Sequence, residues 1–129
     1  MGIYVGLNIQ FPISNLILSG RKTIETRTYP LSEKYLNKDL VMIETPGKTG
    51  NFKSRAIAII RISKCFKYNS KKEFYADSDK HFVTELSEWA WMDRPKFGWV
   101  VEVIKKLDPP QTIEKPKGII YTTEIEIKE

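Results

Sequence analysis

The sequence predicts an α+β domain, namely a small β-barrel of five to six strands, mixed or antiparallel, with a few short helices. Short apolar segments typical of strands recur along the chain between turns rich in proline and glycine, without internal repeats. A chain of 129 residues has the size of one domain, and no change of composition divides it. Hydrophobic residues make up 41% of the sequence, enough to bury a core. We therefore expect a single domain over residues 1–129, closed so that no strand edge is exposed.

The first third of the chain predicts two strands joined by a short helix. Residues 3–9 mix β-branched, aromatic and small side chains and end before Pro12, which lacks a backbone donor. Apolar residues recur at helical spacing over 13–17, and Gly20 suits the left-handed conformation that closes a helix. Residues 23–29 are rich in threonine and other β-branched or aromatic residues, which predicts a second strand that ends at proline.

The middle of the chain predicts a hairpin. Residues 31–36 can form one helical turn before an apolar strand over 40–44. Residues 46–51 have the composition of a tight turn. The strand over 55–66 starts with apolar side chains on both faces, which is typical of a central strand.

A short helix should follow Ser70, because Glu73 lies three residues later at the spacing of a capping box. Residues 77–95 contain charges and two tryptophans without clear periodicity. We expect an irregular excursion there, with one helical turn at residues 84–89.

Two strands complete the predicted sheet. Residues 97–107 return to strand character, and Asp108-Pro109-Pro110 should break that strand. Residues 119–127 end in a strict alternation of isoleucine with glutamate, which predicts a last strand with one buried face.

Charge and composition indicate which partners and which cellular compartment to expect. Lysine and arginine number 21 against 16 acidic residues, a net charge of +5 that favours encounter with polyanions without specifying one. The single cysteine, Cys65, excludes an intramolecular disulfide and suits packing in a reducing compartment. No apolar run approaches the roughly 20 residues of a membrane span, and the start lacks the features of a signal peptide. We expect a cytoplasmic protein without a membrane partner.

The segment from Gly20 to Arg27 is the most unusual in the chain. Thr23, Glu25 and Arg27 share one face of the predicted strand, while the other face keeps only Ile24 as a strong apolar anchor. A hydroxyl, a carboxylate and a guanidinium on one face either meet water or line a polar cavity in which they pair. The residues alone leave both interpretations open.

Gly20, Lys22, Glu25 and Arg27 resemble the Gly-x-Lys-x-x-Glu-x-Arg signature of the ASCH family, and the order of the predicted elements resembles that family as well. Residues 117–121 are similar to its late Gly-x-x-Trp segment, with tyrosine where an indole is common. The resemblance implies a PUA-like β-barrel with a cleft between the barrel and the helix, suited to RNA or a nucleoside.

We therefore expect an RNA- or modified-nucleotide-binding module. Lys22 and Arg27 suit an anionic group, and Glu25 can hold Arg27 in a forked pair. Aromatic rings can stack a base. The expected ligand-binding residues are Gly20, Lys22, Thr23, Glu25, Arg27, Tyr121 and Trp89. Trp99, on an apolar strand, is expected in the core.

A hydrolase acting on a modified nucleoside or on RNA is the alternative, with Lys22 and Glu25 as candidate catalytic residues. Some ASCH proteins resemble amidohydrolases that use a motif lysine, a threonine and a downstream glutamate, and others resemble ribonucleases. Here Glu25 occupies the slot of that threonine, with Thr23 and Thr26 on either side. Glu73 could supply the downstream carboxylate, although helix capping already explains it. Charge also permits a protein-interaction domain.

We predict neither a metal nor another cofactor. His81 stands near Asp77 and Asp79, but one histidine and two loop carboxylates fall short of a ligand set and indicate a solvated acidic turn. Residues 46–50 lack the spacing of a phosphate-binding loop and predict a hairpin turn. The oligomeric state is not predicted.

Overall fold

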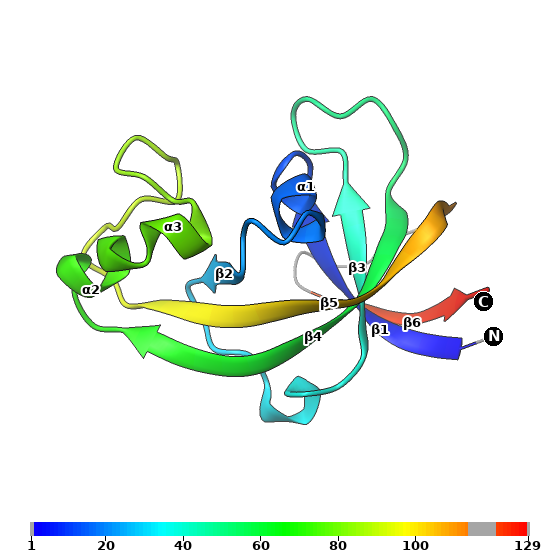
Figure 1. Cartoon of the computed structure of the whole chain (residues 1–129), viewed down its shortest axis with the longest axis horizontal. Helices are drawn as coiled ribbons and strands as arrows, with labels where there is room; N and C mark the ends of the chain where they lie inside the picture. Colours follow the sequence, from blue (N-terminus) through cyan, green and yellow to red (C-terminus); the bar gives the residue numbers. More distant parts are fainter. Residues whose placement is uncertain (1, 114–120, 129) are drawn as a thin grey trace.

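The computed structural model describes residues 2–113 and 121–128, with the backbone alone for 121–124. Six strands and a few short helical segments follow one another along the chain (Figure 1). The strands are β1 (Gly2–Gln10), β2 (Ile24–Arg27), β3 (Leu40–Thr45), β4 (Arg55–Tyr68), β5 (Lys96–Thr112) and β6 (Tyr121–Ile127). The helical segments are α1 (Ile13–Leu18), the 3₁₀ turn η1 (Glu33–Tyr35), α2 (Lys71–Ala76) and α3 (Ser78–His81).

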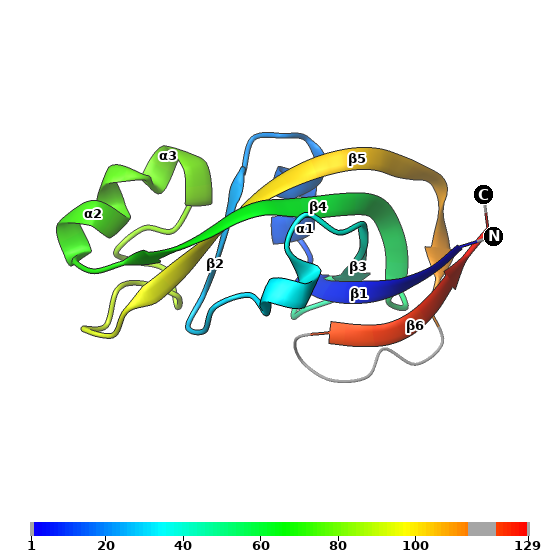
Figure 2. The ribbon, with the colours of Figure 1, turned by 90° about the horizontal axis from the view of Figure 1, so that it is seen from below.

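The strands form one mixed sheet in the order β2-β5-β4-β3-β1-β6. β1 and β3 are parallel, and every other neighbouring pair is antiparallel. The α+β class and the number of strands are confirmed, but the closed barrel is wrong. The sheet stays open because β2 pairs with β5 alone and β6 with β1 alone among the described residues. Figure 2 shows a strongly curved sheet in which the long β4 and β5 arch over β1 and β6.

The core lies on both faces of β3 and β4. Alternation along β3 places Leu40 and Met42 in one hydrophobic cluster and Val41 and Ile43 in a second. β4 pairs with β3 on one side and β5 on the other, so its predicted central position is confirmed. Trp99 is fully buried in the larger cluster, as expected.

The predicted helix ends agree with the structure at two places. α1 ends just before Gly20, whose φ of +81° is the left-handed conformation that glycine adopts without strain. α2 begins after Ser70, whose Oγ accepts a hydrogen bond from the backbone N–H of Glu73 at 3.1 Å. No helix of the described residues has the length and apolar character required to cross a membrane.

Two predictions in the second half are wrong. The helical turn expected at residues 84–89 is absent, and the extra helix is α3, which follows α2 directly. Residues 108–110 do not end the strand either, because β5 continues to Thr112. The register shifts between Ala56, opposite Gln111, and Ala58, opposite Lys106. The prolines therefore lie in a bulge, where the ladder requires no N–H donor.

Candidate functional site

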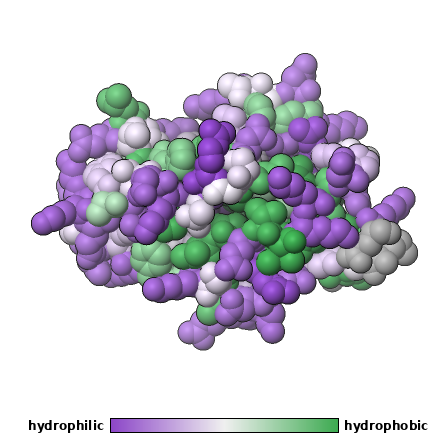
Figure 3. Space-filling view, viewed as in Figure 1, coloured by the Kyte–Doolittle hydropathy of each residue, from purple (hydrophilic) through white to green (hydrophobic). Residues whose placement is uncertain are grey.

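A cavity of about 470 Å³ lies between the α1 side of the sheet and the segment that joins α3 to β5. Its walls come from the ends of β1 and β3, from Ile13 of α1, from β2 and its flanks, and from Val83, Trp89 and Lys96. In the space-filling view the surface is largely hydrophilic, with apolar side chains gathered over the middle of β4 and β5 (Figure 3). The cavity falls within the roughly 300–1,000 Å³ typical of small-molecule pockets.

Backbone hydrogen bonds fix β2 between α3 and β5. The N–H of Thr23 donates to the carbonyl of Lys80 at 3.0 Å, and the N–H of Val101 donates to the carbonyl of Thr23 at 2.9 Å. Ile24 packs into the interior with 4% of its surface exposed. The polar side chains of β2 are thus held on a strand anchored from both sides.

The centre of the cavity wall is an ion cluster around Glu25. One carboxylate oxygen lies 3.4 Å from Lys22 Nζ, and the other accepts a hydrogen bond from Arg27 Nη2 at 3.0 Å. Lys22 is 5% exposed and Glu25 is 8% exposed. For Glu25 and Arg27 the structure supports the interpretation of a polar cavity with paired groups, whereas Thr23 is exposed.

Arg27 is held rigidly by its neighbours. Its Nη2 also donates to the carbonyl of Asn8 at 3.0 Å, and its Nη1 donates to the hydroxyl of Tyr29 at 3.0 Å. The guanidinium carbon lies 5.4 Å from the ring centroid of Trp99. Although burial acts in the opposite direction, Glu25 and Tyr29 raise the pKa of Arg27, so it stays a fixed cation.

Lys22 is more adaptable than Arg27. Its Nζ donates to the carbonyl of His81 at 2.7 Å in addition to its contact with Glu25, which leaves one of its three donors for a ligand. Burial lowers the pKa of Lys22, and the charge of Glu25 opposes that change.

His81 is fully buried, so the expected solvated acidic turn is wrong at this residue. Its Nδ1 accepts a hydrogen bond from the N–H of Val83 at 3.0 Å, which assigns the ring proton to Nε2, 2.6 Å from the carbonyl of Phe74. The ring also stacks on Phe74 with centroids 4.2 Å apart. Burial lowers the pKa of His81 and favours the neutral form. The residue positions the carbonyl that holds Lys22.

The sequence reasoning missed Lys96. This first residue of β5 lines the cavity, is 7% exposed, and donates a hydrogen bond to the carbonyl of Trp89. In a single sequence, nothing about a lysine that follows a proline at the start of a strand indicates that it belongs to a binding site. Only its burial, which the fold decides, distinguishes it from the exposed lysines.

Of the expected ligand-binding residues, Lys22, Glu25, Arg27 and Trp89 line the cavity. Thr26 lines it too, although it was expected on the opposite face. A strand of only four residues next to an irregular flank does not keep a strict two-residue period.

Gly20 and Thr23 are exposed and lie outside the cavity wall. Tyr121 starts β6, but its side chain lies outside the described residues, as do residues 117–120 of the proposed late motif. Glu73 is exposed on α2, where its carboxylate accepts a hydrogen bond from the N–H of Asn69 at 3.2 Å. Its contacts are those of a helix cap.

Three of the solved structures that resemble this fold are crystal structures of ASCH from Zymomonas mobilis. The crystal structure of ASCH from Zymomonas mobilis superposes with a TM-score of 0.63 at 14% identity, covering 85% of this chain and 73% of that one. A serine-to-alanine mutant of the same protein superposes with a TM-score of 0.63 at 14% identity, covering 84% of this chain and 73% of that one. A tyrosine-to-phenylalanine mutant superposes with a TM-score of 0.58 at 14% identity, covering 81% of this chain and 74% of that one. No protein-family model and no curated protein matches the sequence.

The chain has the fold of an ASCH domain.

The resemblance predicted from the motif is thus confirmed at the level of the fold, although the sheet is not closed into the expected PUA-like barrel. At 14% identity the likeness describes the backbone. The chemistry of this ASCH fold has to be argued from the side chains of its own cavity.

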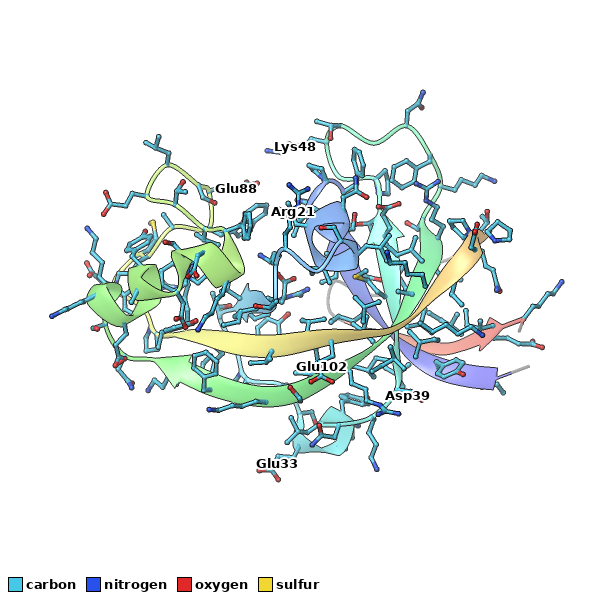
Figure 4. The ribbon with its side chains drawn as sticks, viewed as in Figure 1. Arg21, Glu33, Asp39, Lys48, Glu88 and Glu102 are labelled. Carbon is cyan, nitrogen blue, oxygen red and sulfur yellow. The ribbon has the colours of Figure 1, made fainter. Side chains whose placement is uncertain are left out.

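Two loops of the ASCH fold approach each other beside the cavity. Lys48, in the loop after β3, and Glu88, next to Trp89, point toward one another in Figure 4, with Nζ and Oε2 3.9 Å apart. Both side chains are largely exposed. Such a pair contributes at most about 1 kcal/mol, so it does not hold these loops together firmly.

The charged wall of this ASCH fold is unbalanced. Among the described residues that line the cavity, the cationic side chains are Lys22, Arg27 and Lys96, and the one acidic side chain is Glu25. The cations therefore exceed the anions by two. Because both oxygens of Glu25 already contact cations, the carboxylate is suited to positioning rather than to proton abstraction. The arrangement is chemically suited to an anionic ligand with an apolar or aromatic part.

Proposed function

We propose that this ASCH-fold domain binds RNA or a modified nucleotide in the cavity beside β2. The observation that carries the proposal is the combination of an excess of buried cations with an exposed aromatic ring in one pocket wall. Nucleotides carry anionic phosphate and a flat base, and proteins recognise these with lysine or arginine and with aromatic side chains.

The cationic part is built for electrostatic attraction. Buried charges interact more strongly than exposed ones because water screens them less. Lys22 keeps a donor free of its two contacts, whereas Arg27 uses Nη2 to fix Asn8 and Glu25. Lys22 is therefore the motif cation best placed to contact a phosphate, and Arg27 mainly shapes the wall.

The aromatic part is Trp89. It is 42% exposed although it lines the cavity, which is costly for a large apolar ring without a partner. Stacking of a base on a tryptophan contributes about 1–3 kcal/mol. The apolar residues Ile9, Ile13 and Val83 also line the cavity.

The test is titration of the protein with fluorescein-labelled single-stranded RNAs, and competition by nucleotides, at several salt concentrations. We expect affinity to fall steeply with salt, since phosphate contacts release counterions. Lys22→Met should weaken binding by about 1.5–3 kcal/mol, as for a charge-assisted hydrogen bond. Trp89→Ala should cost about 1–3 kcal/mol through lost stacking.

Two matched variants serve as controls. Lys105→Met removes an exposed charge of β5 outside the cavity, and Leu86→Ala truncates a side chain of the Trp89 loop that is 98% exposed. Both should bind as the wild type does. Binding that is independent of salt and equal in all four variants would refute the proposal.

Hydrolysis is a second candidate, favoured by the lowered pKa of Lys22, which makes its unprotonated amine more accessible. Thr26 lines the same cavity and carries a hydroxyl. Incubation with acylated nucleosides and short RNAs, followed by chromatography, tests this activity. Turnover that disappears in Lys22→Met and persists in Lys105→Met, which changes an exposed residue outside the cavity, would assign the reaction to Lys22, and no turnover in the wild type would reject it.

A further inference from the structure

Lys96 is a buried cation without an acidic partner among the described residues. Its side chain lines the cavity, and its described hydrogen bond is to a neutral group, the carbonyl of Trp89. Burial of an ammonium group is unfavourable unless an anion compensates it. The unfavourable burial of this ammonium group therefore indicates that an anion from outside the protein chain binds there.

The ammonium groups of Lys96 and Lys22 both contact residues of the stacked Phe74–His81 pair. Lys96 Nζ lies 5.3 Å from the ring centroid of Phe74, and Phe74 stacks on His81. Lys22 Nζ donates to the carbonyl of that same histidine. The two lysines thus converge on the α2–α3 side of the cavity, Lys22 from the segment before β2 and Lys96 from the start of β5.

Glu25 does not neutralise this pair. Its carboxylate is shared between Lys22 and Arg27 on the β2 side, and it forms no ion pair with Lys96. The four charged lining residues are three cations and this one acid, which leaves an excess of two positive charges. A phosphate monoester carries about −1.5 to −2 at pH 7, which matches the excess.

We propose that Lys96 and Lys22 form a subsite for a phosphate monoester, so that the pocket takes a nucleotide, or the phosphorylated end of an RNA, in preference to an uncharged nucleoside. This inference rests on the proposed function and names its ligand class. Arg27, which the sequence suggested as a phosphate contact, instead serves to position Glu25.

The electrostatics of Lys96 agree with the geometry. Burial is the main cause that lowers its pKa, and the charge of Lys22 lowers it further. A dianion between the two ammonium groups reverses both effects, because it replaces the lost hydration and screens the like charges.

Lys96 also connects the subsite to the aromatic wall. Its hydrogen bond to the carbonyl of Trp89 holds the backbone of that residue next to the ammonium group. A ligand with phosphate on Lys96 and a base on Trp89 would therefore use two groups that the protein already fixes relative to each other.

The experiment is isothermal titration calorimetry with four probes: nucleosides, their 5′- and 3′-monophosphates, inorganic phosphate, and short RNAs with and without a 5′-phosphate. For the wild type we expect a monophosphate to bind at least tenfold more tightly than its nucleoside. The RNA pair decides whether a free nucleotide or an RNA end is the source of the phosphate.

Variants of Lys96 assign the preference to its side chain. In Lys96→Met the monophosphate should lose its advantage over the nucleoside, and Lys96→Arg should restore part of it. Lys105→Met, on the same strand and exposed, should keep the full preference. Removal of a buried cation without an acidic partner should not lower thermal stability, and circular dichroism checks that the variant is folded.

The outcomes separate the inference from the proposed function. Equal binding of nucleoside and monophosphate by the wild type would overturn the subsite and leave the nucleotide pocket standing. A phosphate preference that survives Lys96→Met would also overturn it. No binding of any probe or RNA would overturn the proposed function itself.

Discussion

Two buried glutamates in this protein have opposite surroundings. Glu44, at the end of β3, is 2% exposed; its oxygens accept hydrogen bonds from Ser14 Oγ at 2.5 Å and from Arg55 Nε at 2.8 Å. One acid there meets one base. Glu25 in the cavity wall faces two cations, Lys22 and Arg27, and a third, Lys96, lines the same cavity without an acidic partner.

The difference separates a structural ion pair from a binding site. The Glu44 group joins α1 to the β3–β4 hairpin, and its charges cancel without any ligand. The Glu25 group leaves an excess of cations beside a cavity of about 470 Å³. Buried charge that the chain does not balance therefore indicates where an anion is expected, whereas burial of charge alone does not.

The largest expected effect is on stability, when each of the two glutamates is replaced by glutamine. Glu25→Gln should destabilise the protein by about 3–5 kcal/mol, because it leaves two buried cations without a counter-charge. Glu44→Gln should cost only about 1.5 kcal/mol, the lower end for a hydrogen bond to a charged group. Arg55, with 37% of its side chain exposed, can return to water.

Urea unfolding of both variants measures the two costs under identical conditions. The glutamine substitutions keep the side-chain shape, remove the charge and replace one acceptor oxygen with an amide donor. An equal or larger loss for Glu44→Gln would contradict the distinction between a balanced and an unbalanced cluster.

A smaller effect should appear in the dependence of stability on pH. The pKa of His81 is lowered from its ordinary value by burial, and the charges of Lys22 and Lys96 lower it further against the opposing hydrogen bond to Phe74 and the charge of Asp77. Below about pH 6.5 the unfolded chain takes up a proton that the folded chain does not, so stability falls as pH decreases. One group contributes a slope of at most about 1.4 kcal/mol per pH unit.

Thermal unfolding between pH 7.5 and 5 measures this slope. His81→Gln should flatten it in that range, whatever the variant does to stability at neutral pH. A slope that is the same in the variant and the wild type would assign the titration to another group.

The smallest effect concerns Lys48 and Glu88, the exposed pair beside the cavity. A double-mutant cycle with Lys48→Met and Glu88→Gln should give a coupling below about 0.5 kcal/mol that decreases with salt, because both side chains are hydrated. A coupling above 1 kcal/mol would show that these loops are closed more firmly than an exposed contact allows.

Local signals in the sequence predict much of the fold. Proline and glycine positions, the Ser70–Glu73 capping box and the two-residue periods predict most strands and two of the helices, because these signals act within a few residues. The open sheet, the bulge at residues 107–110 and helix α3 were not predicted. They depend on which strands pair, and such pairing is a long-range property.

The sequence by itself determined the motif cluster: three charged side chains within six residues, and a strand period that brings Glu25 next to Arg27. Only the tertiary structure decided that Lys96 and the carbonyl of His81, distant in sequence, reach Lys22 at one cavity. The physical reason is that a lysine without an anionic partner is energetically unfavourable only when it is buried. That burial results from the packing of β2, β5 and α3, so no single segment of the sequence predicts it.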